Sequence, residues 1–177
     1  MKSLVLVVLA FMLGALTIAT SAAVRESWPK DRALGARISA HDWADGGLGP
    51  DDAVAYTKEL KRIGFDYVCV SSAALLSHAR VKVEPGYQVP YAAHVKKSVN
   101  INVRAVGMIA DPEQAEEIIA SGKADMVAMA RAFLDNPRWV WHAAERFGVK
   151  LDYPPPYARS QPELWPGAKL ARPRETA

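Results

Sequence analysis

Short apolar runs alternate with longer segments of helical periodicity from Leu34 to Lys150, and this alternation limits the folds that the chain can adopt. It is typical of βα units, whose parallel strands share one sheet and whose helices cover that sheet. The run at 66–71 (DYVCVS) is apolar on both faces, as in a strand that helices cover. We therefore predict an α/β fold with four βα units. The predicted strands are 35–40, 66–71, 101–106 and 125–129, and the predicted helices are 51–63, 91–98, 112–121 and 138–147.

Capping residues mark the ends of two of these helices. Asp111 with Gln114 forms a capping box at the start of the third predicted helix. Asp51 or Asp52 is the expected N-cap of the first, and Gly64 is its expected end.

The first 23 residues form a separate segment. Lys2 is followed by an apolar stretch at 4–19 and by the small residues 20–23, which is the order of a secretory signal peptide. The stretch is short for a membrane-spanning helix, although an uncleaved anchor of about 17 to 20 residues could include 20–23. Alternatively, 23–29 (AVRESWP) is the end of an amphipathic helix, and the apolar segment is left by an upstream truncation or gene fusion.

Charge and cysteine content exclude some functions. The chain carries 22 Lys and Arg against 19 Asp and Glu, a formal net charge of +3, and has no block of five like charges. Nucleic acid is therefore a poor candidate ligand, whereas a single anionic cofactor needs only one or two well-placed cations. The single cysteine, Cys69, lies in a predicted strand and is expected to be a buried thiol.

Two connections are long and rich in proline. Residues 72–90 show no helical period, and a loop of this length more often covers a functional site than merely joins two elements. The tail at 151–177 is predicted to be extended. It is expected either to be disordered or to lie on a neighbouring surface with Tyr153, Tyr157 and Trp165 as anchors.

Three residues near the carboxyl ends of the predicted strands, where parallel α/β folds bind ligands, are candidates for a site. Arg37 should point to the interior or rim of the barrel, where its guanidinium needs either a bound anion or a buried carboxylate. Gly107 either leaves backbone amides open to a phosphate or forms an ordinary tight turn. Arg131 starts a helix, whose free amides also favour an anion. Together, Gly107 and Arg131 predict a phosphate site shared by the last two loops.

Several motifs in the same order resemble the old yellow enzyme family, in its NADH:flavin oxidoreductase and xenobiotic reductase branch. The resemblance covers about residues 24–159 and corresponds to the C-terminal half of a (β/α)8 TIM barrel. The matching stretches are 37–43 (RISAHDW), 70–72, 83–91 (VEPGYQVPY), 105–109 (AVGMI), 122–134 (GKADMVAMARAFL) and 136–139 (NPRW).

The resemblance implies that the chain binds FMN. Arg37 would face the pyrimidine edge of the flavin and stabilise the negative charge that gathers there on reduction. Gly107, Ala130 and Arg131 match the positions that hold the FMN phosphate. Arg159 looks like the arginine that, in this branch, reaches the active site of a neighbouring subunit.

Ser72 and Ala73 complete the cofactor-binding residues that the resemblance implies. The family usually has glycine at the positions of Ala73 and Ala130, where the backbone closely approaches the cofactor. The candidate catalytic residues are Arg37 and Arg159.

The implied activity is hydride transfer from NAD(P)H, through flavin, to a small activated alkene in the cytoplasm. A complete family member has about four further βα units upstream, with a glutamine, a substrate-binding histidine or asparagine pair and a tyrosine proton donor. These have no counterpart here, since His41, His78, His94 and His142 fall in other contexts. We therefore predict a truncated, catalytically incomplete member. The alternative is a non-catalytic interaction fragment, exported or tethered to a membrane.

Four βα units should form an open sheet. Its inward face is expected to carry Val68, Val70, Val103 and Val127, and no second half covers them. We therefore predict a homo-oligomer or a complementing half-barrel as partner.

Overall fold

The computed structural model describes residues 2–72 and 80–171, with side chains from Ala15 onward. The chain divides into two compact units, Met1–Met129 and Ala130–Ala177, which we describe one at a time.

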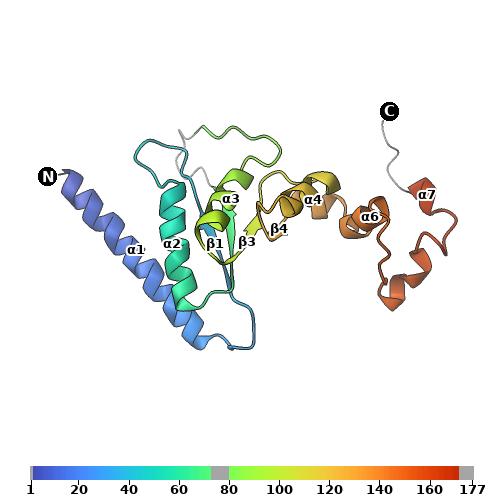
Figure 1. Ribbon diagram of the computed structural model, residues 1–177, viewed down its shortest axis with the longest axis horizontal. Coiled ribbons are helices and arrows are strands. Elements are labelled where there is room, and N and C mark those ends of the chain that lie inside the picture. Colours follow the sequence, from blue (N-terminus) through green and yellow to red (C-terminus); the bar gives the residue numbers. More distant parts are fainter. Residues whose placement is uncertain (1, 73–79, 172–177) are drawn as a thin grey trace. The chain divides into compact units, whose positions relative to one another are not determined.

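The first unit contains one four-stranded sheet in which every neighbouring pair of strands is parallel (Figure 1). The strands follow one another across the sheet in chain order, and a helix lies between each strand and the next in the sequence. This is the arrangement of consecutive βα units in a barrel, so the predicted fold class, α/β with about four βα units of a partial barrel, is confirmed. The strands are β1 (Gly35–Ser39), β2 (Tyr67–Ser71), β3 (Asn102–Ala105) and β4 (Met126–Val127).

The helices of this unit are α1 (Lys2–Ser27), α2 (Pro50–Ile63), α3 (Val89–Ser98) and α4 (Pro112–Ala120). The predicted capping box forms at α4, where the Asp111 side chain accepts a hydrogen bond from the Gln114 amide at 3.1 Å. Gly64 ends α2 in the left-handed conformation, as predicted. The predicted N-cap of α2 is wrong. Gly49 is the N-cap, and Asp52 accepts a hydrogen bond from the Gly49 amide from inside the first turn.

The valine face of the sheet packs on the helices and not toward the barrel interior. Val68, Val70 and Val103 have no exposed surface, and residues paired in register share a face of the sheet. The exposed Arg37 lies on the opposite face, and Val127 pairs with the fully buried Ala105 of the valine face, so the prediction that these valines and Val127 lie on an uncovered inward face is wrong. The fully buried Leu60 of α2 and Val95 of α3 belong to the same core.

The opposite, open face of the sheet carries polar and charged side chains. Arg37, Cys69 and Arg104 are paired across three strands and therefore share this face. The guanidinium carbon of Arg104 lies 5.0 Å from the centroid of the Tyr67 ring, and the Tyr67 ring lies against Gly35. Cys69 is buried between these long side chains, as expected for its thiol.

Helix α1 packs on α2 through its C-terminal half. Ser21 Oγ and Tyr56 Oη are 3.5 Å apart, and Arg25 lies 3.9 Å from a carboxylate oxygen of Asp66. Arg25 also donates to the carbonyls of Trp28 and Pro29, both at 2.9 Å, and so ends the helix. Among the residues that the structure describes, no helix is both long enough and apolar enough to cross a bilayer.

The second unit folds the proline-rich tail back onto a helix. The ring of Tyr153 stacks on that of Trp141 at a centroid distance of 4.1 Å, and Tyr153 Oη donates to Glu145 at 3.0 Å. Tyr157 meets Trp141 edge-on at 5.5 Å. Two of the three predicted anchors thus contact their own chain. The elements are α5 (Arg131–Asp135), α6 (Trp139–Arg146), the 3-10 helix η1 (Pro155–Ser160) and α7 (Ala168–Ala171).

One carboxylate joins three elements of the first unit. Asp125 accepts hydrogen bonds from the Val103 amide at 2.8 Å and from Lys96 Nζ at 2.7 Å, and its own amide donates to the Val103 carbonyl. Partial burial alone would raise the pKa of Asp125, but the hydrogen bonds from Lys96 and Val103 outweigh burial, and the pKa lies below its ordinary value.

We predict that Asp125→Asn lowers the free energy of unfolding at pH 7 by about 1–3 kcal/mol, since a charged hydrogen-bond acceptor is lost. A lowered pKa stabilises the fold above the unfolded-state value of about 3.9, and this contribution disappears as the pH falls through the folded-state pKa. The difference between wild type and variant in urea unfolding should therefore shrink as the pH falls below about 3.9. Asp45→Asn, at an exposed loop carboxylate, is the control, and an equal effect of both substitutions would contradict the assignment.

Candidate functional site

Arg37 is held on the open face of the sheet by a neutral partner. Its Nε donates to Ser71 Oγ at 3.2 Å, and Ser71 Oγ donates in turn to the Ile38 carbonyl at 3.0 Å. Arg37 is exposed, whereas Ser71 is buried. Among the described residues no carboxylate pairs with Arg37, so its terminal nitrogens are free to meet an anion or a carbonyl oxygen.

Ser72 directly follows β2 and presents a second unused polar group. Its carbonyl accepts a hydrogen bond from Gln88 Nε2 at 2.9 Å. Its Oγ is buried and has no partner within the part of the chain that the structure describes. A buried hydroxyl without a partner is costly, which makes Ser72 Oγ a candidate ligand contact. Ala73, the next predicted cofactor residue, and His78 lie outside the described residues.

Gly107 is explained by packing as well as by a positive φ. Its φ is 111°, its carbonyl accepts from the Gly86 amide at 3.0 Å, and an added Cβ would stand 2.8 Å from the Gln88 Cβ. The loop with the PGYQVP motif therefore docks directly on Gly107. The role of Gly107 in holding a phosphate stays a prediction.

Gln88 is the residue that the sequence analysis missed. It is 4% exposed and donates to both the Ser72 carbonyl and Tyr87 Oη, each at 2.9 Å. Gln88 thus fixes the carboxyl ends of β2 and β3 relative to each other. A long amide side chain inside the apolar motif YQVPY was the only signal available.

An aromatic group borders the loop that follows β1. Trp43, at a φ of 58°, lies 5.0 Å from the ring of His41 and 5.9 Å from that of Tyr91. The Trp43 amide donates to His41 Nδ1 at 2.7 Å. Burial raises the pKa of Tyr91. His41 therefore stabilises the loop that follows β1.

Two other histidines are also bound to side chains of their own unit. His94 Nε2 lies 2.8 Å from Asp51 Oδ1, and His142 Nδ1 lies 2.9 Å from Asn136 Nδ2. Within the described residues, no group of three histidine, cysteine, aspartate or glutamate side chains could hold a metal ion.

Ala130 and Arg131 begin the second unit. Both are exposed, and the Ala130 carbonyl accepts from the amides of Phe133 and Leu134, each at 3.1 Å. Arg131 has no carboxylate partner among the described residues. Because Gly107 belongs to the first unit, their joint phosphate site stays a prediction.

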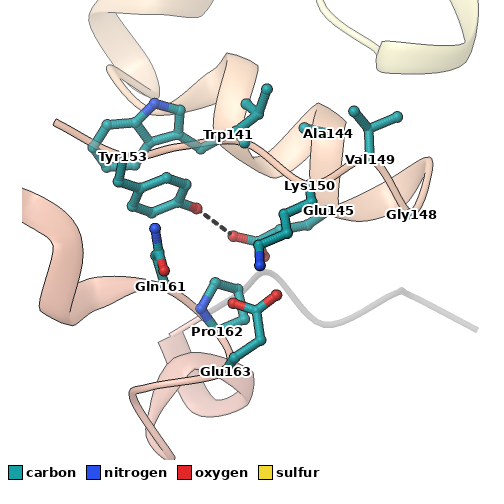
Figure 2. Close-up of a pocket in the computed structure, with 11 residues that line it drawn as sticks. Trp141, Ala144, Glu145, Gly148, Val149, Lys150, Tyr153, Gln161, Pro162 and Glu163 are labelled. Atoms are coloured by element: carbon teal, nitrogen blue, oxygen red, sulfur yellow. Dashed lines mark hydrogen bonds between the residues drawn. The ribbon is translucent and has the colours of Figure 1, made fainter.

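Arg159 lies on η1 and borders a recess of 420 Å³ in the second unit. A second recess, of 270 Å³, lies between α6 and the segment after η1 (Figure 2). Figure 2 shows Lys150 beside Glu145 and Glu163, so this second recess carries charges of both signs. It offers no clear preference for an anion.

Comparison with known proteins places this chain beside flavin enzymes. Residues 14–148 match the NADH:flavin oxidoreductase / NADH oxidase family. The chain is 45% identical over 137 residues to an NADPH dehydrogenase of Geobacillus thermodenitrificans, strain NG80-2, and 44% identical over 137 residues to one of Geobacillus sp. WCH70. These matches cover 77% of this chain and 39% of each relative.

Among solved structures, a dipeptide epimerase from Enterococcus faecalis V583 has a TM-score of 0.47 and 20% sequence identity. The match covers 76% of this chain and 34% of the epimerase.

We predict that Gly107→Ala destabilises the first unit more than Gly122→Ala does. Both glycines have positive φ, but an added Cβ at Gly122 meets nothing within 4 Å. The backbone term alone should cost roughly 1 kcal/mol at each site, and the contact with Gln88 should add about 1–3 kcal/mol at Gly107. Urea unfolding measures both, and equal losses would show that Gln88 does not pack on Gly107.

Proposed function

Because this chain belongs to the NADH:flavin oxidoreductase / NADH oxidase family, we propose that it binds FMN and takes part in an NAD(P)H-dependent reduction. The observation that carries the proposal is the family match over 14–148, which includes all four strands and the residues at their carboxyl ends. The chain spans 39% of the length of the relatives it matches. That this chain has the activity of those complete enzymes is therefore a proposal.

The residues present fit a flavin. Arg37 offers unpaired terminal nitrogens on the open face of the sheet, and Ser72 offers a buried hydroxyl without a partner in the described residues. Both lie at or near the carboxyl ends of adjacent parallel strands, where such folds bind ligands. We assign Arg37 to the pyrimidine edge and Ser72 to a neighbouring polar contact. Ala73, which follows Ser72, is assigned to the same cofactor by the resemblance.

When bound, FMN would supply the hydride transfer between NAD(P)H and a small activated alkene. Arg37 would then stabilise negative charge at the pyrimidine edge, with its guanidinium orientation fixed by Ser71. Arg131, with the amides near Gly107 and Ala130, would neutralise the phosphate. Arg159 would act at the active site of a neighbouring subunit.

We predict that added FMN binds the purified chain, with shifted visible bands and quenched flavin emission. Arg131→Ala should weaken FMN binding about tenfold or more, since a charge-assisted hydrogen bond contributes roughly 1.5–3 kcal/mol. Riboflavin lacks the phosphate, so its binding should not change in Arg131→Ala. Arg37→Met should weaken the binding of FMN and of riboflavin to the same extent.

Arg62→Ala is the control, because Arg62 is exposed and pairs with Glu59 at 2.8 Å away from the strand ends. The assignment of the phosphate site is wrong if high micromolar FMN leaves the visible spectrum unchanged. It is also wrong if Arg131→Ala weakens the binding of riboflavin as much as the binding of FMN.

We also predict that the chain self-associates or binds a complementing half-barrel. β1 and β4 are the outer strands of the described sheet, and unpaired edges promote pairing with another chain. Size-exclusion chromatography with light scattering should show a mass above that of the 19.3 kDa monomer. A stable, cooperatively unfolding monomer would contradict this prediction.

A further inference from the structure

Arg104 is the second arginine on the open face of the sheet, and nothing neutralises it. Its guanidinium carbon lies 5.0 Å from the centroid of the Tyr67 ring, and its Nε is buried without a hydrogen-bond partner. Among the described residues no carboxylate lies within 4.0 Å of Arg104. A cation–π contact uses the face of the guanidinium and leaves the donors at its edge available. Arg104 is therefore oriented, but its charge is not compensated.

Arg104 and Arg37 reach toward opposite ends of the strands. Both are paired in register with Cys69 of β2. Arg37 donates to Ser71, which is two residues nearer the carboxyl end of β2. Arg104 instead lies over Tyr67, which is two residues nearer the amino end. The two guanidinium groups therefore serve different parts of the open face.

The position of the Tyr67 ring supports this difference in direction. Gly35 is the partner of Tyr67 in register, and the ring fills the space that a side chain at Gly35 would occupy. The ring therefore stays level with Gly35, near the amino ends of the strands. Arg104 consequently lies outside the proposed flavin site at the carboxyl ends.

Closure of the barrel would bury Arg104. In a complete (β/α)8 barrel the open face becomes the interior, which layers of side chains fill. Arg104 is already half-buried in this chain. A guanidinium in such an interior is stable only when a counter-charge and hydrogen-bond acceptors meet it. The strands of this chain supply no counter-charge, because their open-face positions carry two arginines and no aspartate or glutamate.

A second copy of this chain does not fit the open face. Two such faces brought together would oppose four arginines, and neither face would contribute a carboxylate. Like charges that meet across an interface disfavour it. Contacts between copies through the edge strands β1 and β4 are not affected by this repulsion. A partner that covers the face needs the opposite charge.

We propose that the open face binds a complementing half-barrel with an aspartate or glutamate on its inward face, and that this carboxylate pairs with the edge of the Arg104 guanidinium. The inference rests on the complementing half-barrel of the proposed function and selects it, over a second copy, as the occupant of this face. The carboxylate lies near the amino ends of the strands, away from the flavin. Arginine suits this role because its planar edge can bind both oxygens of one carboxylate.

The test uses the upstream βα units of the Geobacillus thermodenitrificans NADPH dehydrogenase as the half-barrel, co-expressed with the full chain and purified through a tag on this chain. Analytical ultracentrifugation of the diluted complex gives its dissociation constant. We expect Arg104→Leu to raise this constant roughly tenfold or more. Arg104→Glu should raise it further, because its carboxylate repels that of the partner.

Lys58→Glu is the matched control. Lys58 is exposed on α2, which packs on the opposite face of the sheet, so the same reversal of charge should leave the dissociation constant unchanged. Urea unfolding of the chain alone separates docking from folding. Because Arg104 forms no ion pair with the described residues, Arg104→Leu should change the unfolding midpoint little, and a large fall would overturn the proposal.

The proposal is also wrong if no complex forms with the wild-type chain, or if neither Arg104 substitution weakens the complex. Equal effects of Arg104→Leu and Arg104→Glu would indicate a neutral partner group and contradict it. An equimolar mixture of wild type and Arg104→Glu that associates more tightly than either alone would place a second copy on the face and overturn it.

FMN titration of the chain alone distinguishes this proposal from the proposed function. Arg104→Leu should bind FMN as the wild type does, because Arg104 points away from the carboxyl ends of the strands. If FMN binds but docking does not depend on Arg104, only the docking proposal is wrong. If docking depends on Arg104 but FMN does not bind, only the flavin assignment is wrong.

Discussion

The contact between Gln88 and Gly107 shapes the ligand-binding edge of the sheet. Gln88 is buried, donates to the carbonyl at the end of β2 and leaves no room for a side chain at the end of β3. One amide therefore ties two strand ends to the loop with the PGYQVP motif. Since a buried amide is stable only when its hydrogen bonds are made, the loop has one favourable position. The contacts of Gln88 therefore shape the edge of the sheet at which Arg37 and Ser72 lie.

The two faces of the sheet follow from the two-residue period of the strands. β2 reads Tyr67, Val68, Cys69, Val70, Ser71, and the valines of this run pack on the helices while the other residues line the open face. The sequence alone could not assign the faces, because Tyr67 and Cys69 are nearly as apolar as the valines. Val68 and Val70 belong to one core with Leu60 of α2 and Val95 of α3, whereas the open face carries Arg104 and the exposed Arg37.

The alternation of apolar runs and helical segments was enough to predict all four strands and the parallel sheet, and the pair Asp111 and Gln114 predicted the capping box. Local sequence patterns did not predict conformations that depend on a residue distant in the sequence. Gly107 is required by Gln88, which is 19 positions away in the sequence, and Tyr153 stacks on Trp141, which is 12 positions away and on the preceding helix. Trp43 combines a positive φ with a hydrogen bond to His41 and contacts with the neighbouring rings, an arrangement that no turn motif predicts.

The cations of this chain fall into two groups according to what holds them. Arg25, Arg62 and Lys96 pair with Asp66, Glu59 and Asp125, and their charge is neutralised within the fold. Arg37 is held by a hydroxyl, while Arg104 and Arg138 are held by aromatic rings. A neutral partner fixes a guanidinium without cancelling its charge, so these side chains are oriented and still able to attract an anion. Structural cations are therefore separated from candidate ligand-binding cations by the chemistry of their partner, and exposure alone would not separate them, because Arg62 and Arg37 are both exposed.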